Sequence, residues 1–369
     1  MKGLYIHIPF CIKKCNYCDF VSYPGMLLNE DLYVQRLIEE AKSYKDNNLK
    51  FDTIYFGGGT PSLLKAENIG KILECVKSNF DVLHDSEITI EVNPSTIDYE
   101  KALKLKSYGI NRVSLGAQSF IDEELKLLGR THLSEDIINS FNILRKAGFN
   151  NISLDLMYAL PKQSLSSLST SIDKVLKLNP EHISCYGLKI EDNTPFGKML
   201  SDGTIKEKSD DEYAKMYELI IDILEKNGYN QYEISNFSKE GSESKHNLKY
   251  WLSKEYIGLG LSASSYYSSS RYTNTYDFDK YIKSFEKAEN ITLSKEDKMS
   301  EYMILSLRLC KIGANKKEFE KLFGISIKEK FSNQINKHIK TGMIIEKEDR
   351  FILNPKVYFV SNSILCDFI

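Results

Sequence analysis

The chain has 369 residues, of which 42% are hydrophobic and 27% are charged, as is typical of a globular protein with a substantial core. Its 49 basic and 51 acidic side chains give a formal net charge of −2, which offers no argument for a nucleic-acid partner. The sequence has no run of about 18 apolar residues, so we expect no membrane-spanning helix.

The first segment, MKGLYIHIPFC, contains one lysine, and its apolar run is interrupted by His7 and Pro9. This is not the pattern of a secretory signal peptide, and we expect a cytoplasmic protein. Because thiols stay reduced in the cytoplasm, the seven cysteines are not expected to form a disulfide framework. Three of the seven lie within eight residues of each other, which favours a metal site.

Strand-like and helix-like segments alternate through the first half of the chain. Six such units predict an α/β fold with a parallel sheet and right-handed crossovers. We expect a partial (β/α)6 TIM-like barrel, with an open doubly wound sheet as the alternative. In either form, functional groups should lie at the C-terminal ends of the strands. The expected strands are 3–8, 52–56, 87–92, 111–116, 151–157 and 181–187, and the expected helices lie near 30–47, 65–79, 98–107, 134–146 and 165–178.

The pattern changes after about residue 190. We predict a helix near 210–227, followed by a segment at 229–270 that is rich in Tyr, Ser and Asn. From about residue 298, helical segments precede a short hairpin, which suggests a small winged-helix-like domain of mixed charge. The expected division is a core barrel at 1–190, a connecting region at 191–297 and a C-terminal domain at 298–369.

Cys11, Cys15 and Cys18 form a C-x3-C-x2-C motif directly after the first strand. Thiolates are the natural ligands of iron–sulfur clusters, and three ligands on a [4Fe–4S] cluster leave one iron open. We expect S-adenosylmethionine (SAM) to bind that iron through its amino and carboxylate groups. An electron from the cluster would then cleave SAM and yield a deoxyadenosyl radical. A structural zinc site, with a fourth ligand from His7 or elsewhere, is the alternative.

Two motifs, Y-I-H-I-P-F-C-x3-C-x-Y-C at 5–18 and G-G-G-T-P at 57–61, resemble the coproporphyrinogen oxidase branch of the radical SAM proteins. The resemblance covers nearly the whole chain. Within that branch, three features resemble the HemW group of heme chaperones rather than the oxidases. Phe20 stands where the oxidases have a further cysteine, only four residues precede Tyr5 where the oxidases have a long extension, and H-N-L-K-Y-W at 246–251 matches the group's H-N-x-x-Y-W motif.

The resemblance also implies which residues contact SAM. Tyr5 matches an aromatic side chain beside SAM, and the loop 58–60 matches the loop that receives its amino group. Glu91, Gln118 and Asp155 match the polar groups that hold the ribose hydroxyls and amino group of SAM. Arg130 matches the arginine that faces the SAM carboxylate, to which a guanidinium is suited. The alternative for Tyr5 is a core strand residue, and the alternative for the triple glycine is a tight turn. Asp155 could instead form a structural salt bridge, and Arg130 could be an exposed surface arginine. The implied SAM residues are Tyr5, Tyr17, Gly58, Gly59, Thr60, Glu91, Gln118, Arg130 and Asp155.

The H-N-L-K-Y-W motif suggests a heme site. His246 would be an axial ligand of heme iron, and Tyr250 and Trp251 would cover the apolar face of the ring. The alternative is a surface or capping histidine. The resemblance therefore implies a heme chaperone that delivers heme to an acceptor hemoprotein, expected to be respiratory, without oxidase activity. The rival functions are oxygen-independent coproporphyrinogen III oxidase, an enzyme of porphyrin biosynthesis, and a radical SAM methyltransferase.

Overall fold

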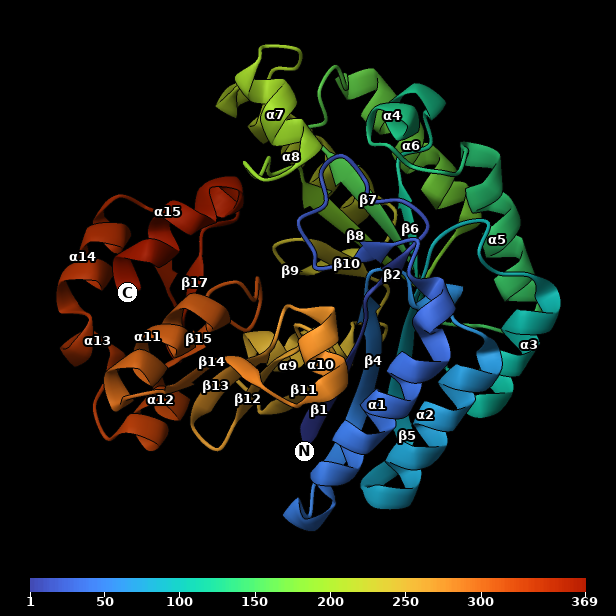
Figure 1. The fold of residues 1–369 in the computed structure, drawn as a ribbon. Helices are drawn as coiled ribbons and strands as arrows, with labels where there is room; N and C mark the ends of the chain where they lie inside the picture. The colour runs from blue at the N-terminus through green and yellow to red at the C-terminus, as the bar shows by residue number, and fades with distance from the viewer.

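Six parallel strands, adjacent in chain order, form the centre of the computed structural model, which describes residues 1–369 except for the side chain of Asp46. Each predicted strand is present, and the predicted α/β class is confirmed. The sheet remains open, with β14 and β9 at its two edges, so it is a partial barrel (Figure 1). The six strands are β1 (Lys2–Ile8), β4 (Lys50–Gly58), β5 (Asp81–Val92), β6 (Arg112–Gln118), β7 (Ile152–Tyr158) and β8 (His182–Gly187).

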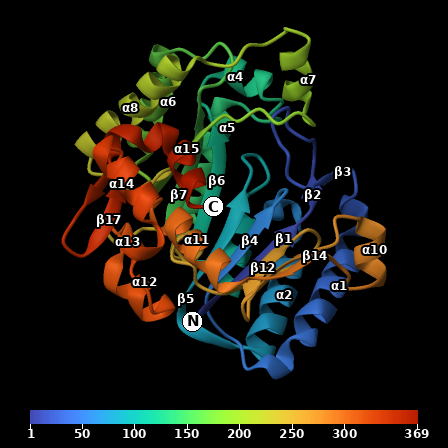
Figure 2. The same ribbon diagram turned by 90° about the vertical axis from the view of Figure 1, so that its left-hand side faces the viewer.

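The connecting helices cover the outer face of this sheet, as Figures 1 and 2 show. In α6, the side chain of Ser164 accepts a hydrogen bond from the Ser167 N–H and caps the helix, while Asn179 ends it in the left-handed conformation. The buried stripe of α6 is Leu168, Ile172 and Val175, which pack in the main core. The helices are α1 (Glu30–Ser43), α2 (Ala66–Asn79), α3 (Tyr99–Tyr108), α4 (Asp122–Leu127), α5 (Ser134–Lys146) and α6 (Leu165–Leu178).

The segment between residues 191 and 297 extends the same sheet at both ends. At one edge β10 pairs antiparallel with β8, and at the other β11 pairs parallel with β1. These strands were not predicted, because their Ser, Tyr and Asn side chains show no clear alternation. The elements are α7 (Pro195–Ser201), α8 (Asp210–Lys226), β9 (Asn230–Glu233), β10 (Asn236–Ser238), α9 (Lys245–Trp251), β11 (Tyr256–Leu259), β12 (Ser264–Tyr267), β13 (Ser270–Asn274), α10 (Phe278–Lys283) and β14 (Lys287–Thr292).

The C-terminal part has the predicted order of helices followed by a hairpin. The hairpin strands β16 and β17 pair antiparallel, and β15 pairs with β17 to complete a small three-stranded sheet. Within the described residues, no helix has both the length and the apolar character needed to cross a membrane. The elements are α11 (Lys295–Ser306), β15 (Ala314–Asn315), α12 (Lys316–Phe323), α13 (Ile327–Lys330), α14 (Ser332–Lys340), β16 (Ile344–Glu346), β17 (Arg350–Leu353) and α15 (Ser361–Leu365).

Candidate functional site

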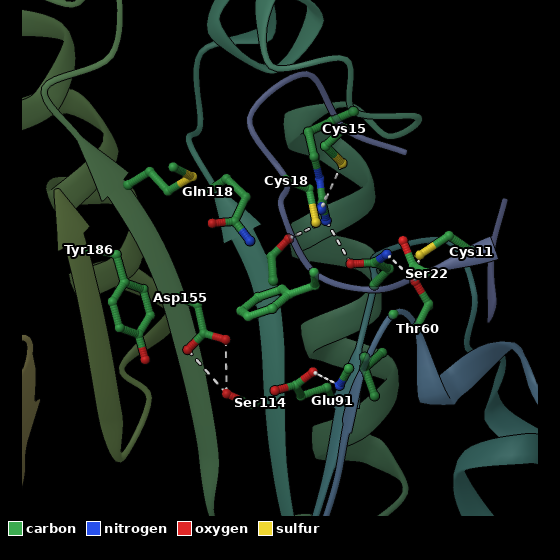
Figure 3. A pocket seen from close by; sticks show the side chains of 18 of the residues that line it. Cys11, Cys15, Cys18, Ser22, Thr60, Glu91, Ser114, Gln118, Asp155 and Tyr186 are labelled. Carbon is green, nitrogen blue, oxygen red and sulfur yellow. Dashed lines mark hydrogen bonds between the residues drawn. The ribbon is translucent and has the colours of Figure 1, made fainter. Parts of the chain in front are cut away.

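A cavity of about 430 Å³ opens on the inner face of the sheet, beneath the loop that carries the three cysteines. Figure 3 shows side chains from β5, β6, β7 and β8 along one side and the cysteines along the other. Most of the residues expected to bind the cluster or SAM therefore line one space. Those that do are Cys11, Cys15, Cys18, Tyr17, Gly58, Gly59, Thr60, Glu91, Gln118, Arg130 and Asp155.

The cysteine loop is fastened at its base and along its length. Strand β2 (Phe10–Cys11) pairs with β3 (Tyr23–Pro24), which closes the loop. Asn16 fixes the middle of the loop, because its side chain donates to the Leu127 carbonyl at 2.8 Å at the end of α4. His7 is a buried histidine of β1 that bonds the Val21 carbonyl at 3.0 Å. The loop is thus held against the sheet at several separate points.

The three thiols lie at different places around the cavity. Cys11 Sγ is 3.6 Å from Thr60 Oγ1, and Arg130 Nη1 donates to Cys15 Sγ at 3.6 Å. Burial raises the pKa of the Cys18 thiol. Among the described residues, no three His, Cys, Asp or Glu side chains are grouped closely enough to hold a single metal ion.

The glycine loop, residues 57–60 at the end of β4, approaches β1 and β2 so closely that side chains on Gly58 and Gly59 would not fit. Gly58 has φ +115°, and a Cβ there would lie 2.6 Å from the His7 ring. A Cβ on Gly59 would lie 2.6 Å from the Phe10 carbonyl oxygen and 3.0 Å from Cys11 Sγ. Thr60 N donates to the same Phe10 carbonyl at 2.8 Å. The loop therefore presents bare backbone to the cavity beside Cys11.

Two carboxylates, from the strands on either side of β6, face the cavity. Glu91 accepts hydrogen bonds from Tyr55 Oη at 2.9 Å and from Gly58 N at 3.2 Å, and burial raises its pKa to about 7. Asp155 accepts from Ser114 Oγ at 2.8 Å and Ser153 Oγ at 2.9 Å, and burial raises its pKa as well. Gln118 ends β6 with φ +66° (Figure 3), a conformation uncommon outside glycine.

Arg130 lies between the cysteine loop and the sheet. Its Nη2 donates to Asn93 Oδ1 at 2.7 Å and to the Gly116 carbonyl at 2.9 Å, and its buried Nε has no hydrogen-bond partner. The neighbouring Tyr17 also lines the cavity, and burial raises the pKa of its hydroxyl. A fixed guanidinium beside Cys15 provides positive charge at the place where a cluster and a carboxylate are expected.

Several cavity residues were missed by the sequence analysis. Alternate residues of β6 point inward, so Arg112, Ser114 and Gly116 share a wall with Gln118. Counting back from Gln118 in steps of two would have found them. Asn247 comes from α9 and is the second residue of the H-N-L-K-Y-W motif, which was assigned to heme rather than to this cavity. The missed polar residues are Lys13, Lys14, Ser22, Tyr55, Asn93, Arg112, Ser114, Ser184, Tyr186 and Asn247.

Tyr5 and His246 do not belong to the wall of this cavity. Tyr5 lies in the sheet beside Tyr55, with ring centroids 6.3 Å apart, and its hydroxyl is 3.1 Å from His7 Nδ1. It is a half-buried residue of β1 close to the glycine loop, since a Cβ on Gly57 would lie 3.0 Å from its ring.

His246 is only 1% exposed and packs against β4 rather than lying at a ligand-accessible surface. Its Nδ1 is 2.9 Å from Thr53 Oγ1, its Nε2 is 2.8 Å from Tyr250 Oη, and its ring stacks on Tyr55. Burial lowers its pKa to about 3, so the imidazole is neutral at pH 7. Both ring nitrogens are engaged, and this geometry does not support the expected axial ligand.

The two aromatic residues after His246 are also packed within the protein. Tyr250 meets Tyr256 edge-on at 4.7 Å, and Arg308 lies over the Trp251 ring at 4.5 Å. Arg308 follows α11, so its contact with Trp251 packs α9 against the C-terminal part of the chain. The expectation that these rings cover a heme face is likewise not supported by this arrangement.

Comparisons with known proteins agree with the geometry. Residues 5–175 match the model of the Radical SAM superfamily, and residues 293–359 match that of the HemN C-terminal domain. The heme chaperone HemW of Lactococcus lactis is 38% identical, with 100% of this chain and 97% of the relative aligned. HemW of Bacillus subtilis is 36% identical, over 100% of this chain and 99% of the relative.

Among solved structures, coproporphyrinogen III oxidase (HemN) from Escherichia coli, a radical SAM enzyme, superposes with a TM-score of 0.86. The superposition covers 99% of this chain and 89% of the oxidase, at 24% identity, and so shows a shared fold. Together with the full-length similarity to the HemW proteins, the site geometry gives the family. The chain belongs to the HemW family of radical SAM proteins.

Proposed function

We propose that this protein is a heme chaperone, which binds heme and delivers it to an acceptor hemoprotein. We further propose a [4Fe–4S] cluster on Cys11, Cys15 and Cys18, with an exchangeable SAM in the cavity beneath. The observation that carries the proposal is the grouping of these three thiols and the polar SAM residues around one cavity. The HemW relatives that align over the full chain support the heme role.

The residues present fit a cluster and SAM. Three thiol groups that line one cavity are of the ligand type that an iron–sulfur cluster needs. Gly59 keeps free the space that a Cβ would fill beside Cys11, and Arg130 has an unsatisfied buried Nε beside Cys15. When bound, the cluster and SAM would supply one-electron reductive chemistry.

The chain's own groups would hold SAM in a defined orientation. The backbone at Gly58 and Gly59 would receive the amino group, and Arg130 would face the carboxylate. Glu91 and Asp155 would accept hydrogen bonds from the ribose hydroxyls, and each is already oriented by two donors. Because such oriented acceptors need no rearrangement, they favour binding in one pose.

The heme ligand must be accessible, and His246 would have to leave Thr53 and Tyr250 to reach iron. We propose that α9 supports the heme role through its packing, and that direct ligation by His246 requires α9 to open. We also propose that the protein acts in the cytoplasm, where its thiols stay reduced, and that the acceptor is a respiratory hemoprotein.

Anaerobic reconstitution with iron, sulfide and heme tests the proposal. We expect about four irons and one heme per chain, and an electron paramagnetic resonance signal that changes when SAM is added. Cys15→Ser should lose the cluster, whereas Cys75→Ser, which changes a cysteine packed between α1 and α2, should keep it. One zinc and no iron would refute the cluster, and absence of stoichiometric heme would refute the chaperone role.

Delivery needs a second measurement. The heme-loaded protein should transfer heme to the apo form of a respiratory hemoprotein, followed by the absorption spectrum of the acceptor. Transfer should be faster than release to apomyoglobin, which takes up free heme without recognising the donor. Equal rates would mean that heme simply dissociates and that the acceptor is not recognised.

A further inference from the structure

Arg112, the first residue of β6, is a charged side chain buried in the barrel interior with an unsatisfied nitrogen. It is 1% exposed, lines the cavity, and has no hydrogen-bond partner for its Nε. It pairs in register with Thr89, one step farther from the cysteines than Ser114, which pairs with Glu91. Arg112 therefore lies at the floor of the cavity, below the groups assigned to SAM.

The carboxylates near Arg112 are already bound by other donors. Glu87 accepts from the backbone of Lys245 at 3.1 Å and of His246 at 3.0 Å, at the N-terminus of α9. Asp155 accepts from two serine hydroxyls. A guanidinium keeps its charge in proteins, and burying a charge without a close partner is costly. The floor thus holds a fixed positive charge that can accept an anionic group.

Other polar side chains line the same cavity. Asn247 reaches it from α9, and Ser184 and Tyr186 reach it from β8. Tyr186 is 41% exposed although it belongs to an inner strand, because its ring borders the open cavity. In Figure 3, Tyr186, Asp155 and Ser114 lie on the side of the cavity away from Cys11 and Cys15. An amide, hydroxyls and a planar guanidinium are groups that together can hold a carboxylate.

We propose that Arg112, with Asn247, forms a carboxylate-binding site at the floor of the cavity. The carboxylate would belong to a ligand that reaches past the glycine loop into the barrel. Two sources share this chemistry: a propionate of a tetrapyrrole, which rests on the proposed heme function, and the carboxylate of SAM. A bound propionate would bring heme next to Glu91 and Asp155, the residues assigned to SAM. A bound SAM carboxylate would place SAM deeper in the cavity than a contact with Arg130 would.

The test compares ligands with and without the carboxylate on the reconstituted protein under anaerobic conditions. One arm uses heme and heme dimethyl ester in the same detergent, and the other uses SAM and decarboxylated SAM. Trp251, the only tryptophan, lies four residues after Asn247 on α9 and reports binding by fluorescence. In one of the two arms, the ligand that carries the carboxylate should bind about 10- to 100-fold more tightly than the ligand that lacks it. This is the factor expected for a charged hydrogen-bonded contact.

Arg112→Met should remove that preference, and Arg112→Lys should restore part of it. Arg271→Met is the matched control, because Arg271 bonds Glu301 at 2.6 and 2.8 Å and is not among the cavity residues. The comparison of ligands on the wild-type protein does not depend on how well the variants fold. Asn247→Leu should weaken the preference by a smaller factor, because it removes a neutral donor.

The outcomes separate the two proposals. No binding of either heme form, with a preference for SAM that depends on Arg112, would refute the chaperone role and keep the floor site. Binding of heme with no effect of the ester, together with a preference for SAM that survives Arg112→Met, would overturn the floor site and leave the chaperone role standing. Preferences that survive Arg112→Met in both arms would also overturn it.

Discussion

Replacing Glu91 with Gln should make the stability of the ligand-free protein less dependent on pH. Glu91 has a pKa of about 7 in the folded protein against 4.5 for the free side chain, because burial disfavours its charged form. Between these values the folded state binds more protons than the unfolded state, so the free energy of unfolding falls as pH rises. The contribution of Glu91 to the stability of the folded wild-type protein is therefore greatest below about pH 4.5.

The size of the effect follows from the two pKa values. A shift of one pKa unit corresponds to about 1.4 kcal/mol, so the full penalty above pH 7 is about 3 kcal/mol. Most of it, about 2 to 3 kcal/mol, develops between pH 5 and pH 8. This is an upper value, because part of the Glu91 side chain faces the cavity, where water can solvate it. A glutamine keeps an oxygen to accept from Tyr55 and Gly58 without the charge.

Urea unfolding of the apo-protein, followed by circular dichroism at pH 5 to 8, measures this difference. Glu91→Gln should match the wild type near pH 5 and exceed it near pH 8. Glu67→Gln is the control, because Glu67 is on the surface of α2 and hydrogen-bonded to Lys104, which lowers its pKa. A wild-type and Glu91→Gln pair whose stability difference is the same at every pH would refute the reasoning.

Arg130→Ala should weaken SAM binding to the reconstituted protein about 10- to 100-fold by calorimetry, since it removes a charged contact; unchanged affinity would mean that Arg130 does not face SAM. Gly59→Ala should prevent cluster assembly while leaving the circular dichroism spectrum intact, because its Cβ would meet the Phe10 carbonyl and Cys11; a normal iron content would contradict this. His246→Ala should lower the unfolding free energy by about 2 to 4 kcal/mol through a buried cavity and lost hydrogen bonds. A large loss of heme affinity in that variant without destabilisation would instead restore His246 as a ligand. The wild-type protein, given SAM and a reductant, should not convert coproporphyrinogen III to protoporphyrinogen IX, and product detected by chromatography would favour the oxidase.

The sequence by itself determined the features that depend on neighbouring residues. Six alternating strand and helix patterns predicted the central sheet, because burial on a strand or a helix face repeats with a short period. The helix at 134–146 was predicted with the bounds of α5. The spacing of Cys11, Cys15 and Cys18, read with the G-G-G-T-P loop, indicated the family from short motifs alone. In the folded chain, these cysteines and that loop line one cavity.

Only the tertiary structure decided the features that depend on residues far apart in the chain. Tyr256–Leu259 became a strand by pairing with β1, although its own sequence shows no alternation. His246 is buried because Thr53, 193 residues earlier, and Tyr250 bind its ring nitrogens, a partnership that no local pattern reveals. Arg112 looked like an ordinary polar start of a strand, and its place at the cavity floor follows from the register of β6 against β5. Local spacing determines which way a side chain points from its own element, but burial and partners depend on contacts between distant segments.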